Sequence, residues 1–243
     1  MQAVILAGGA GTRLRPLTLS TPKPMIDING RPFLSYIVDV LKRYGITELV
    51  FCIGYLSEKF KEYFGDGSKF GVNIKYTFEK EFFGTAGAIK LAEEHLKNDF
   101  FVLNGDTYLD VDYKKVYDAF KKANTLGLMV VYDNAENIAE ENIAIDDKGI
   151  IISYGKKETL KKGDKLVKVK VPKGIKFKYI DSGVYVFKRE IVNMIKDNEF
   201  VSLEGDIYPD LIRKKQLMSY ATSNRYYDLG TPERLELIRT VLK

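Results

Sequence analysis

The feature that most constrains the fold is an apolar run near the start of the chain that ends in a glycine-rich loop. Residues 3–7 read Ala-Val-Ile-Leu-Ala, and three glycines follow within the next four residues. A run this short and this rich in β-forming residues predicts a fully buried strand. Glycines after a strand let backbone N–H groups turn inward and approach an anion closely. Arg13, Arg15 and Lys23 add positive charge nearby, so the stretch suits a polyphosphate.

Two better-known phosphate-binding loops do not match this one. A Walker A loop ends in Gly-Lys-Ser/Thr, whereas this loop continues Gly11-Thr12-Arg13. The dinucleotide-binding fingerprint needs a third glycine at the position of Leu14. The loop is therefore of another type, and the glycines alone leave a plain tight turn between a strand and a helix as the alternative.

Length and composition predict one α/β domain and restrict the chemistry that it can carry. The chain has 243 residues, of which 45% are hydrophobic, so it can bury a large core. Its one cysteine, Cys52, lies in an apolar run and is expected to be a buried thiol. Its one histidine, His95, lies in a charged helical segment and is expected at the surface. This argues against His/Cys zinc sites and Cys–His or Ser–His pairs, leaving Asp, Glu, Lys, Arg and a hard metal ion.

The charge pattern does not indicate a nucleic-acid or membrane surface. The net charge is +5, and many lysines lie in residues 156–178. Valine and lysine alternate over residues 167–171, which indicates a half-exposed strand more simply than a binding patch. The N-terminal apolar run has only strand length and no basic flank, so we expect neither a signal peptide nor a spanning segment. We expect a cytoplasmic protein with no nucleic-acid and no membrane partner.

Strand and helix patterns alternate through the first half of the chain. We expect strands at residues 3–7, 46–53, 72–78 and 99–103, and helices at residues 32–44, 57–64 and 85–97. A βαβ series of this kind predicts a three-layer α/β/α fold, in which helices cover both faces of a mostly parallel sheet. Ligands in such sheets bind at the carboxyl ends of the strands.

The second half is less regular and shows no domain boundary. We expect helices at residues 111–122, 203–214 and 231–242, and strands at residues 127–132, 183–187 and 218–221. A hairpin is expected over residues 142–153, turning at 147–149, and a further extended excursion is expected to turn near 172–174. The two halves are expected to share one sheet within a single domain.

Asp106 is the carboxylate with the clearest position for chemistry. It follows the expected strand at 99–103, and Gly105 precedes it. A hard oxygen donor at the carboxyl end of a buried strand suits Mg²⁺. The alternative from position alone is an aspartate that only forms the turn.

The loop and the segments after it resemble a known family. Residues 8–18 (GGAGTRLRPLT) and 22–41 (PKPMIDINGRPFLSYIVDVL) resemble the signature of the sugar-1-phosphate nucleotidyltransferases, which make nucleoside-diphosphate sugars. Further similar segments lie at 78–88, 181–185, 202–209 and 226–232. The resemblance implies a Rossmann-like, mostly parallel mixed sheet of the nucleotide-diphospho-sugar transferase type. It implies one nucleotidyltransferase domain over 1–243, with nucleotide bound by residues 1–110 and sugar phosphate by residues 111–243.

The resemblance also implies a reaction and a set of site residues. An oxygen of the sugar 1-phosphate attacks the α-phosphorus of a nucleoside triphosphate in line, and pyrophosphate leaves without a covalent enzyme intermediate. Arg13, Lys23 and Asp106 are the implied catalytic residues, with Arg13 on the leaving phosphates and Lys23 on the α-phosphate. Asp106 and Asp228 are the implied ligands of Mg²⁺. The implied nucleotide-binding positions are Leu6, Ala7, Gly8, Gly9, Gly11, Thr12, Arg13, Lys23, Glu79, Gly84 and Thr85. The implied sugar-phosphate-binding positions are Lys157, Ser182, Gly183 and Glu204, with Lys156 an alternative to Lys157.

The nucleobase is predicted from Glu79. Many thymidylyl- and uridylyltransferases of the family carry glutamine there, whereas an ionised carboxylate can accept the two adjacent N–H donors of guanine. The segment around Glu79 also looks most like the guanylyltransferases for mannose 1-phosphate and for D-glycero-D-manno-heptose 1-phosphate. We therefore expect GTP, with UTP, dTTP or CTP as alternatives. The alternative for Glu79 itself is a solvent-facing side chain at the end of a strand.

The sugar is less well defined than the base. Glu141-Asn142 replaces the Tyr-Gly pair that is usual before the second-half hairpin, so the sugar pocket departs from the family pattern. The chain ends without the left-handed β-helix of many mannose enzymes, which favours the heptose type. Other expectations from the resemblance are a role in surface polysaccharide synthesis and a homodimer. A non-catalytic paralogue that binds nucleotide sugars, or another phosphorylated acceptor, remains the alternative.

Overall fold

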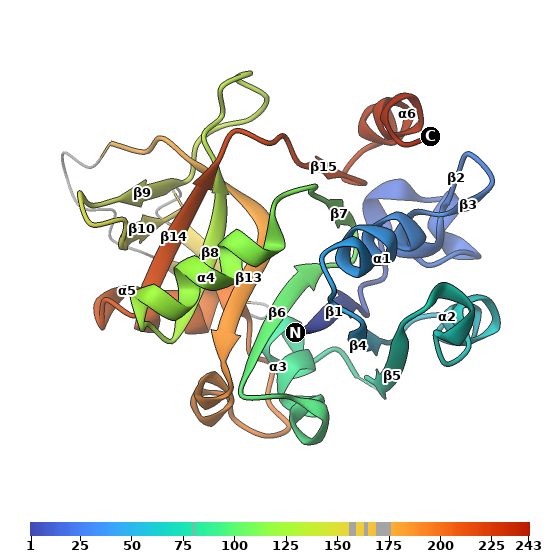
Figure 1. The fold of residues 1–243 in the computed structure, drawn as a ribbon, viewed down its shortest axis with the longest axis horizontal. Helices are drawn as coiled ribbons and strands as arrows, with labels where there is room; N and C mark the ends of the chain where they lie inside the picture. Colours follow the sequence, from blue (N-terminus) through green and yellow to red (C-terminus); the bar gives the residue numbers. More distant parts are fainter. Residues whose placement is uncertain (80, 156–158, 163–164, 169–175) are drawn as a thin grey trace.

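The computed structural model describes residues 1–79, 81–155, 159–162, 165–168 and 176–243. Its centre is a seven-stranded sheet with the strand order β14-β8-β13-β6-β1-β4-β5 (Figure 1). The strands are β1 (Gln2–Ala7), β4 (Glu48–Ile53), β5 (Asn73–Phe78), β6 (Asp99–Asn104), β8 (Gly127–Tyr132), β13 (Ile180–Lys188) and β14 (Leu217–Thr222). All neighbouring pairs are parallel except those of β13, which is antiparallel to both β6 and β8. The mostly parallel mixed sheet is confirmed.

Helices cover both faces of this sheet, as expected for three layers. One face packs against α1 (Phe33–Arg43), α2 (Glu58–Phe64) and α4 (Tyr113–Ala123), and α6 (Pro232–Val241) extends the same buried cluster beside β15 (Tyr227–Asp228). The other packs against α3 (Gly84–Leu91), α5 (Tyr208–Arg213) and the hairpin of β9 (Ile143–Ile145) and β10 (Ile151–Tyr154). In Figure 1, α1 and α4 lie on the near side of the sheet.

Alternation along each strand divides the core into two clusters. Val4 of β1 and Val102 of β6 belong to one buried cluster, whereas their neighbours Ile5 and Leu103 belong to the other. This is the period of two that a strand covered on both faces requires. The buried strands therefore hold the loops at their ends on a rigid support.

The order of the strands opens a crevice beside β1. The chain leaves β1 for β4 and β5 on one side, and then returns to β6 on the other side. The connections that follow β1 and β6 thus run in opposite directions at the carboxyl end of the sheet. Ligands of open α/β sheets bind at such a topological switch point.

The expected elements of the first half are confirmed with small shifts at their ends, and the main differences lie elsewhere. The expected helix at 85–97 ends as α3 at Leu91 and continues as a 3-10 turn over Glu93–His95. The expected strand at 183–187 is part of the nine-residue β13, which begins three residues earlier. Gly183, with a φ of +73°, lies at an irregularity inside this strand and does not mark its start. The expected helix at 203–214 starts with a π-helical turn, Leu203–Ile207, before α5.

The lysine-rich segment contains an antiparallel pair, β11 (Thr159–Lys162) and β12 (Lys165–Lys168). The expected turn at 172–174 lies outside the described residues. The hairpin expected at 142–153 is confirmed as β9 and β10, and Gly149 has a φ of +81° at its turn.

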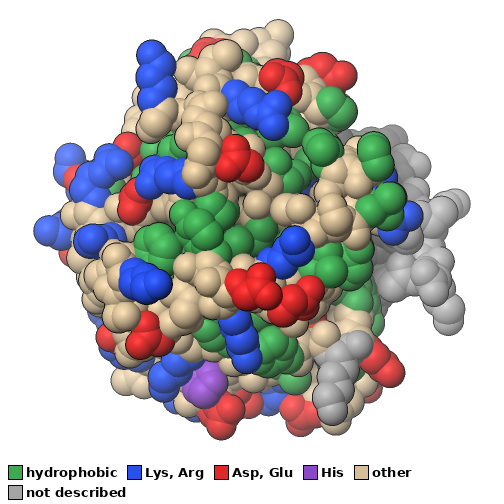
Figure 2. Space-filling model, turned by 90° about the vertical axis from the view of Figure 1, so that its right-hand side faces the viewer, with side chains coloured by type: hydrophobic (Ala, Val, Ile, Leu, Met, Phe, Trp, Pro, Cys, Tyr) green, Lys and Arg blue, Asp and Glu red, His purple; other side chains and the backbone are tan. Residues whose placement is uncertain are grey.

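Three features considered from composition can be located among the described residues: the surface charges, Cys52 and His95. Figure 2 shows one face of the molecule, on which basic and acidic side chains are interspersed rather than gathered by sign. Cys52 is fully buried, and burial raises the pKa of its thiol to about 12. His95 is half-buried in its 3-10 turn. Among the described residues, no helix has the length and apolar character needed to span a bilayer.

Candidate active site

A cavity of about 450 Å³ lies at the switch point between β1 and β6. Its size is within the range of small-molecule sites. Its wall includes the last residues of β1 with the glycine loop after them, Asn104 at the end of β6 with Asp106 two residues later, and the first turn of α3. Most of the predicted site residues line it: Leu6, Ala7, Gly8, Gly9, Gly11, Thr12, Arg13, Lys23, Gly84, Thr85, Asp106 and Glu204.

The glycine loop is closed by contacts that leave no room for a side chain at Gly11. Gly11 has a φ of +59°, and a Cβ there would lie 3.0 Å from Thr18 Cγ2 and 3.1 Å from Lys23 Cβ. The Thr18 hydroxyl donates a hydrogen bond to the Gly11 carbonyl at 2.9 Å. A left-handed backbone in close contact favours glycine. The loop thus turns the chain so that Lys23 returns to the cavity.

Lys23 and Asp106 form an ion pair in the wall of the cavity. Lys23 is 7% exposed, and the Asp106 side chain is 32% exposed. Arg13 lies at the exposed side of the cavity and forms no ion pair with any described residue. The cavity therefore holds one cation already paired with a carboxylate and one cation that is available to an anion.

The first turn of α3 closes the cavity on another side. Gly84 has a φ of +80°, and a Cβ there would lie 2.5 Å from the Val201 carbonyl oxygen. Thr85 Oγ1 donates to the Glu204 carboxylate at 3.1 Å and accepts from the Leu203 N–H at 2.8 Å. These bonds join α3 to the π-helical turn that carries Glu204. A carboxylate from the second half of the chain is thereby fixed in the same cavity as the glycine loop.

Glu79 lines a side chamber of about 590 Å³ that shares Gly8, Gly9 and Phe82 with the main cavity. The Glu79 N–H donates to the Ile53 carbonyl at 3.0 Å, which places the residue directly after β5. Burial raises the pKa of the Glu79 carboxyl to about 7. The side chain is half-buried against the glycine loop, in contrast to the solvent-facing alternative.

The residues predicted for the sugar phosphate are only partly gathered around the cavity. Glu204 lines it, whereas Ser182 is fully buried and donates to the Val130 carbonyl at 2.7 Å. Gly183 packs against Asn104. A Cβ added to Gly183 would lie 3.1 Å from the side-chain Nδ2 of Asn104. Lys157, like Lys156, lies outside the described residues.

Asp181 anchors the strand beside these residues. Its carboxylate accepts hydrogen bonds from the Tyr154 hydroxyl at 3.0 Å, the Tyr185 hydroxyl at 2.8 Å and the Gly183 N–H at 2.9 Å. Burial raises the pKa of Asp181 to about 6, although these hydrogen bonds oppose the shift. The group positions Gly183 rather than facing the cavity, since it does not line it.

Asp228 comes next to Asp106 along the backbone through a pairing distant in sequence, but it lines a different, smaller hollow and not the main cavity. Strand β7 (Thr107–Tyr108), directly after Asp106, pairs with β15 (Tyr227–Asp228). The Asp228 carboxylate accepts a hydrogen bond from Arg234 at 2.6 Å. No cluster of three or more His, Cys, Asp or Glu gathers in the described part of the chain. The Asp106 carboxylate in the cavity fits Mg²⁺, because this ion is usually held by one or two carboxylates together with substrate phosphates and water.

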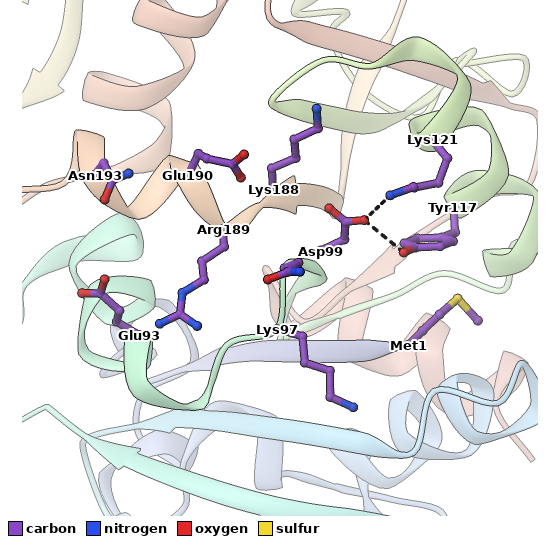
Figure 3. Close-up of a pocket in the computed structure, with 11 residues that line it drawn as sticks. Met1, Glu93, Lys97, Asp99, Tyr117, Lys121, Lys188, Arg189, Glu190 and Asn193 are labelled. Carbon is purple, nitrogen blue, oxygen red and sulfur yellow. Dashed lines mark hydrogen bonds and ion pairs between the residues drawn. The ribbon is translucent and has the colours of Figure 1, made fainter.

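A larger hollow, of about 1210 Å³, lies at the opposite end of the sheet (Figure 3). Its wall includes Asp99, the first residue of β6, and Lys188, the last residue of β13. Asp99 accepts hydrogen bonds from Lys121 at 2.7 Å and from Tyr117 at 3.1 Å. The hollow carries both basic and acidic side chains, and no predicted site residue lines it. We therefore place the candidate active site at the carboxyl ends of the strands.

Four residues of the main cavity were missed in the sequence: Pro24, Phe82, Ala88 and Asn104. Asn104 is the last residue of β6, directly before Gly105-Asp106, so its position at a strand end is a usable signal. Phe82 is 61% exposed and borders both chambers, which no local pattern indicates.

Comparison with known proteins identifies the family. A family profile described as nucleotidyl transferase matches residues 2–241. D-glycero-alpha-D-manno-heptose 1-phosphate guanylyltransferase of Campylobacter jejuni is 33% identical over 234 residues, covering 96% of this chain and 96% of that protein. Mannose-1-phosphate guanyltransferase of Saccharomyces cerevisiae is 33% identical over 240 residues, covering 96% of this chain and 62% of that protein.

A solved structure gives the same answer. HddC from Yersinia pseudotuberculosis, in a crystal structure with GMP-PN, superposes with a TM-score of 0.77 at 26% identity. The alignment covers 100% of this chain and 99% of that one. The chain matches the family profile and a relative of similar length. Its glycine loop and Asp106 also line one cavity. The chain is an enzyme of the nucleotidyl transferase family.

Proposed function

We propose that this chain transfers a guanylyl group from GTP to a sugar 1-phosphate of the heptose or mannose type and releases pyrophosphate. The observation that carries the proposal is the single cavity that brings together the glycine loop, Arg13, Lys23 and Asp106. The names of the relatives from Campylobacter jejuni and yeast support the choice of base and sugar class. The nucleoside-diphosphate sugar would serve surface polysaccharide synthesis in the cytoplasm.

Within this proposal the first half of the chain, residues 1–110, holds the nucleotide. The triphosphate lies along the glycine loop, where backbone N–H groups face an anion. Arg13 is exposed at the cavity and free of ion pairs with described residues, which suits the β- and γ-phosphates that leave. Lys23 is buried beside Asp106, which suits the α-phosphate. The second half, residues 111–243, supplies Glu204 for the sugar and Lys157 for its phosphate.

Asp106 and Asp228 are the residues that would hold Mg²⁺. The bound ion would neutralise charge on the phosphate oxygens during transfer. A bound triphosphate would offer Lys23 a phosphate oxygen in place of the Asp106 carboxylate. Lys23 would then bind the α-phosphate, and Asp106 would be available as a ligand of the ion.

Positioning and charge stabilisation provide the catalysis in this scheme. Holding the attacking oxygen and the α-phosphorus together can supply about 7–11 kcal/mol of the barrier. Preorganised cations such as Lys23 and Arg13 stabilise charge on the transferring and leaving oxygens. No covalent intermediate is needed, which agrees with a cavity lined by no histidine or cysteine among the described residues.

The proposal is tested by measuring pyrophosphate release for each nucleoside triphosphate against heptose, mannose and glucose 1-phosphates, with Mg²⁺ and with EDTA. Metal-dependent release that is fastest with GTP and heptose or mannose 1-phosphate is the expected result. Release with UTP or CTP instead of GTP would support nucleotidyl transfer but contradict the proposed preference for guanine. No release with any pair would reject the proposed function and favour a non-catalytic nucleotide-sugar-binding protein. Size-exclusion chromatography with light scattering measures the molecular mass in solution and so tests the expected homodimer.

A further inference from the structure

The carboxyl group of Glu79 is held in an unusual position at the meeting point of three strand ends. Its Oε2 lies so close to the glycine loop that a Cβ on Gly8 would come within 2.2 Å of it. Gly54, which follows β4, packs against Gly8 as well. A Cβ added to Gly54 would lie 3.1 Å from the Gly8 carbonyl oxygen. Glu79 Oε1 is buried and has no hydrogen-bond partner in the described part of the chain. A carboxyl group that lines a cavity and has one buried oxygen without a partner is left with an unmade hydrogen bond.

Among the described residues, the groups around this carboxyl leave its charge largely uncompensated. The glycine loop contributes only Gly8, Gly9 and Ala10 to the side chamber. From β4 and its end come Cys52, a neutral buried thiol, and the phenol Tyr55. The segment after β5 contributes the exposed Glu81 and the aromatic Phe82, while Lys80 lies outside the described residues.

These surroundings explain why the group can change its protonation near neutral pH. Burial raises the pKa of Glu79 to about 7, and the Phe83 N–H offsets only part of the shift. Arg13 lines the neighbouring cavity rather than this chamber. Both the charged and the neutral forms are therefore populated under ordinary assay conditions.

The two forms recognise different bases. An ionised carboxylate only accepts hydrogen bonds, so it matches the adjacent N1–H and N2–H₂ donors of guanine. A neutral carboxylic acid donates one bond and accepts one, as a glutamine amide does. That pattern matches an N3–H beside a carbonyl, which is the edge that uracil and thymine present.

We propose that the protonation state of Glu79 sets the nucleotide preference of this enzyme. The ionised carboxylate selects guanine, and the neutral acid admits uracil and thymine. The inference rests on the proposed function, because it takes the side chamber as the place of the base. It predicts that preference for GTP over UTP and dTTP increases as the pH rises.

The test compares kcat/KM for GTP and for UTP from pH 6 to pH 8, with one sugar 1-phosphate and Mg²⁺. For a group with a pKa of about 7, the ionised fraction rises about tenfold over this range and the neutral fraction falls about tenfold, so the GTP/UTP ratio should rise about a hundredfold. Effects of pH on the transfer step cancel in the ratio, because both nucleotides share that step. Glu79→Gln should give a low ratio that does not change with pH. The control Glu81→Gln, in the same chamber, should keep the wild-type slope.

A binding measurement tests the same inference without turnover. Calorimetry in buffers of different ionisation enthalpy should detect more protons released when GTP binds at pH 6.5 than when UTP binds. A GTP/UTP ratio that is flat in the wild-type protein, or that keeps its slope in Glu79→Gln, would overturn the inference. Absence of pyrophosphate release with every nucleotide would instead overturn the proposed function, and the proton release would still decide the role of Glu79.

Discussion

Replacing Gly84 by alanine should destabilise the protein through two separable effects. Gly84 has a φ of +80°, a region that costs an L-residue about 1–2 kcal/mol. The new Cβ would also lie 2.5 Å from the Val201 carbonyl oxygen. That oxygen accepts hydrogen bonds from the Ala86 N–H at 3.0 Å and the Gly87 N–H at 3.1 Å, so it cannot move away without weakening both.

The two effects add to a definite expectation for Gly84→Ala. Each weakened hydrogen bond costs about 0.5–1.5 kcal/mol, so the free energy of unfolding should fall by about 2–5 kcal/mol in total. The pyrophosphate-releasing activity should fall as well, because Thr85 is the next residue and holds Glu204. Urea unfolding followed by circular dichroism measures the change in stability.

Two other glycines serve as matched controls for this measurement. Gly45 has a φ of +74° but nothing within 4 Å of an added Cβ, so Gly45→Ala should show only the conformational cost of about 1–2 kcal/mol. Gly9 has neither a positive φ nor a neighbour within 4 Å, so Gly9→Ala should change the free energy of unfolding by less than about 0.5 kcal/mol. The reasoning is refuted if Gly84→Ala is no more destabilising than Gly45→Ala.

Three further predictions follow from the site. Lys23→Met should lower kcat by about 10²–10³-fold while circular dichroism stays unchanged, because a preorganised cation is lost from the cavity; a wild-type kcat would contradict its role. Thr85→Val should raise the KM for the sugar phosphate, because Glu204 and the Leu203 N–H both lose their partner, and steady-state kinetics with an unchanged KM would oppose this. Burial raises the pKa of Asp181 to about 6, above its ordinary value of about 4, so this group stabilises the fold below pH 4 and loses that contribution as the pH rises through 6. The stability difference between wild-type protein and Asp181→Asn, measured in urea from pH 4 to 7, should change in that direction, and a constant difference would exclude the effect.

Local pattern was sufficient for the part of the site that one strand and its loop create. The apolar run at 3–7 and the glycines after it form β1 and a cavity wall, because a buried strand and a glycine turn are both determined within a few residues. Asp106 was predictable for the same reason, since it follows a buried strand directly.

Contacts between distant segments were not predictable from pattern. Asp228 comes beside Asp106 only through the two-residue pairing of β7 and β15, and nothing in either segment alone indicates that pairing. The burial of Glu79 depends on Gly8 and Gly54, which follow two other strands. The resemblance to a family supplied both residues as candidates, whereas their surroundings needed the fold.

The most direct test of the account follows the phosphorus atoms of GTP. The protein is incubated with Mg²⁺, a heptose or mannose 1-phosphate, and GTP labelled at either the α- or the γ-phosphate. The account predicts that the α-label appears in the nucleoside-diphosphate sugar and the γ-label in pyrophosphate, and that Lys23→Met forms both products about 10²–10³-fold more slowly. Appearance of the γ-label on the sugar or in free phosphate, or product formation by Lys23→Met at the wild-type rate, would contradict it.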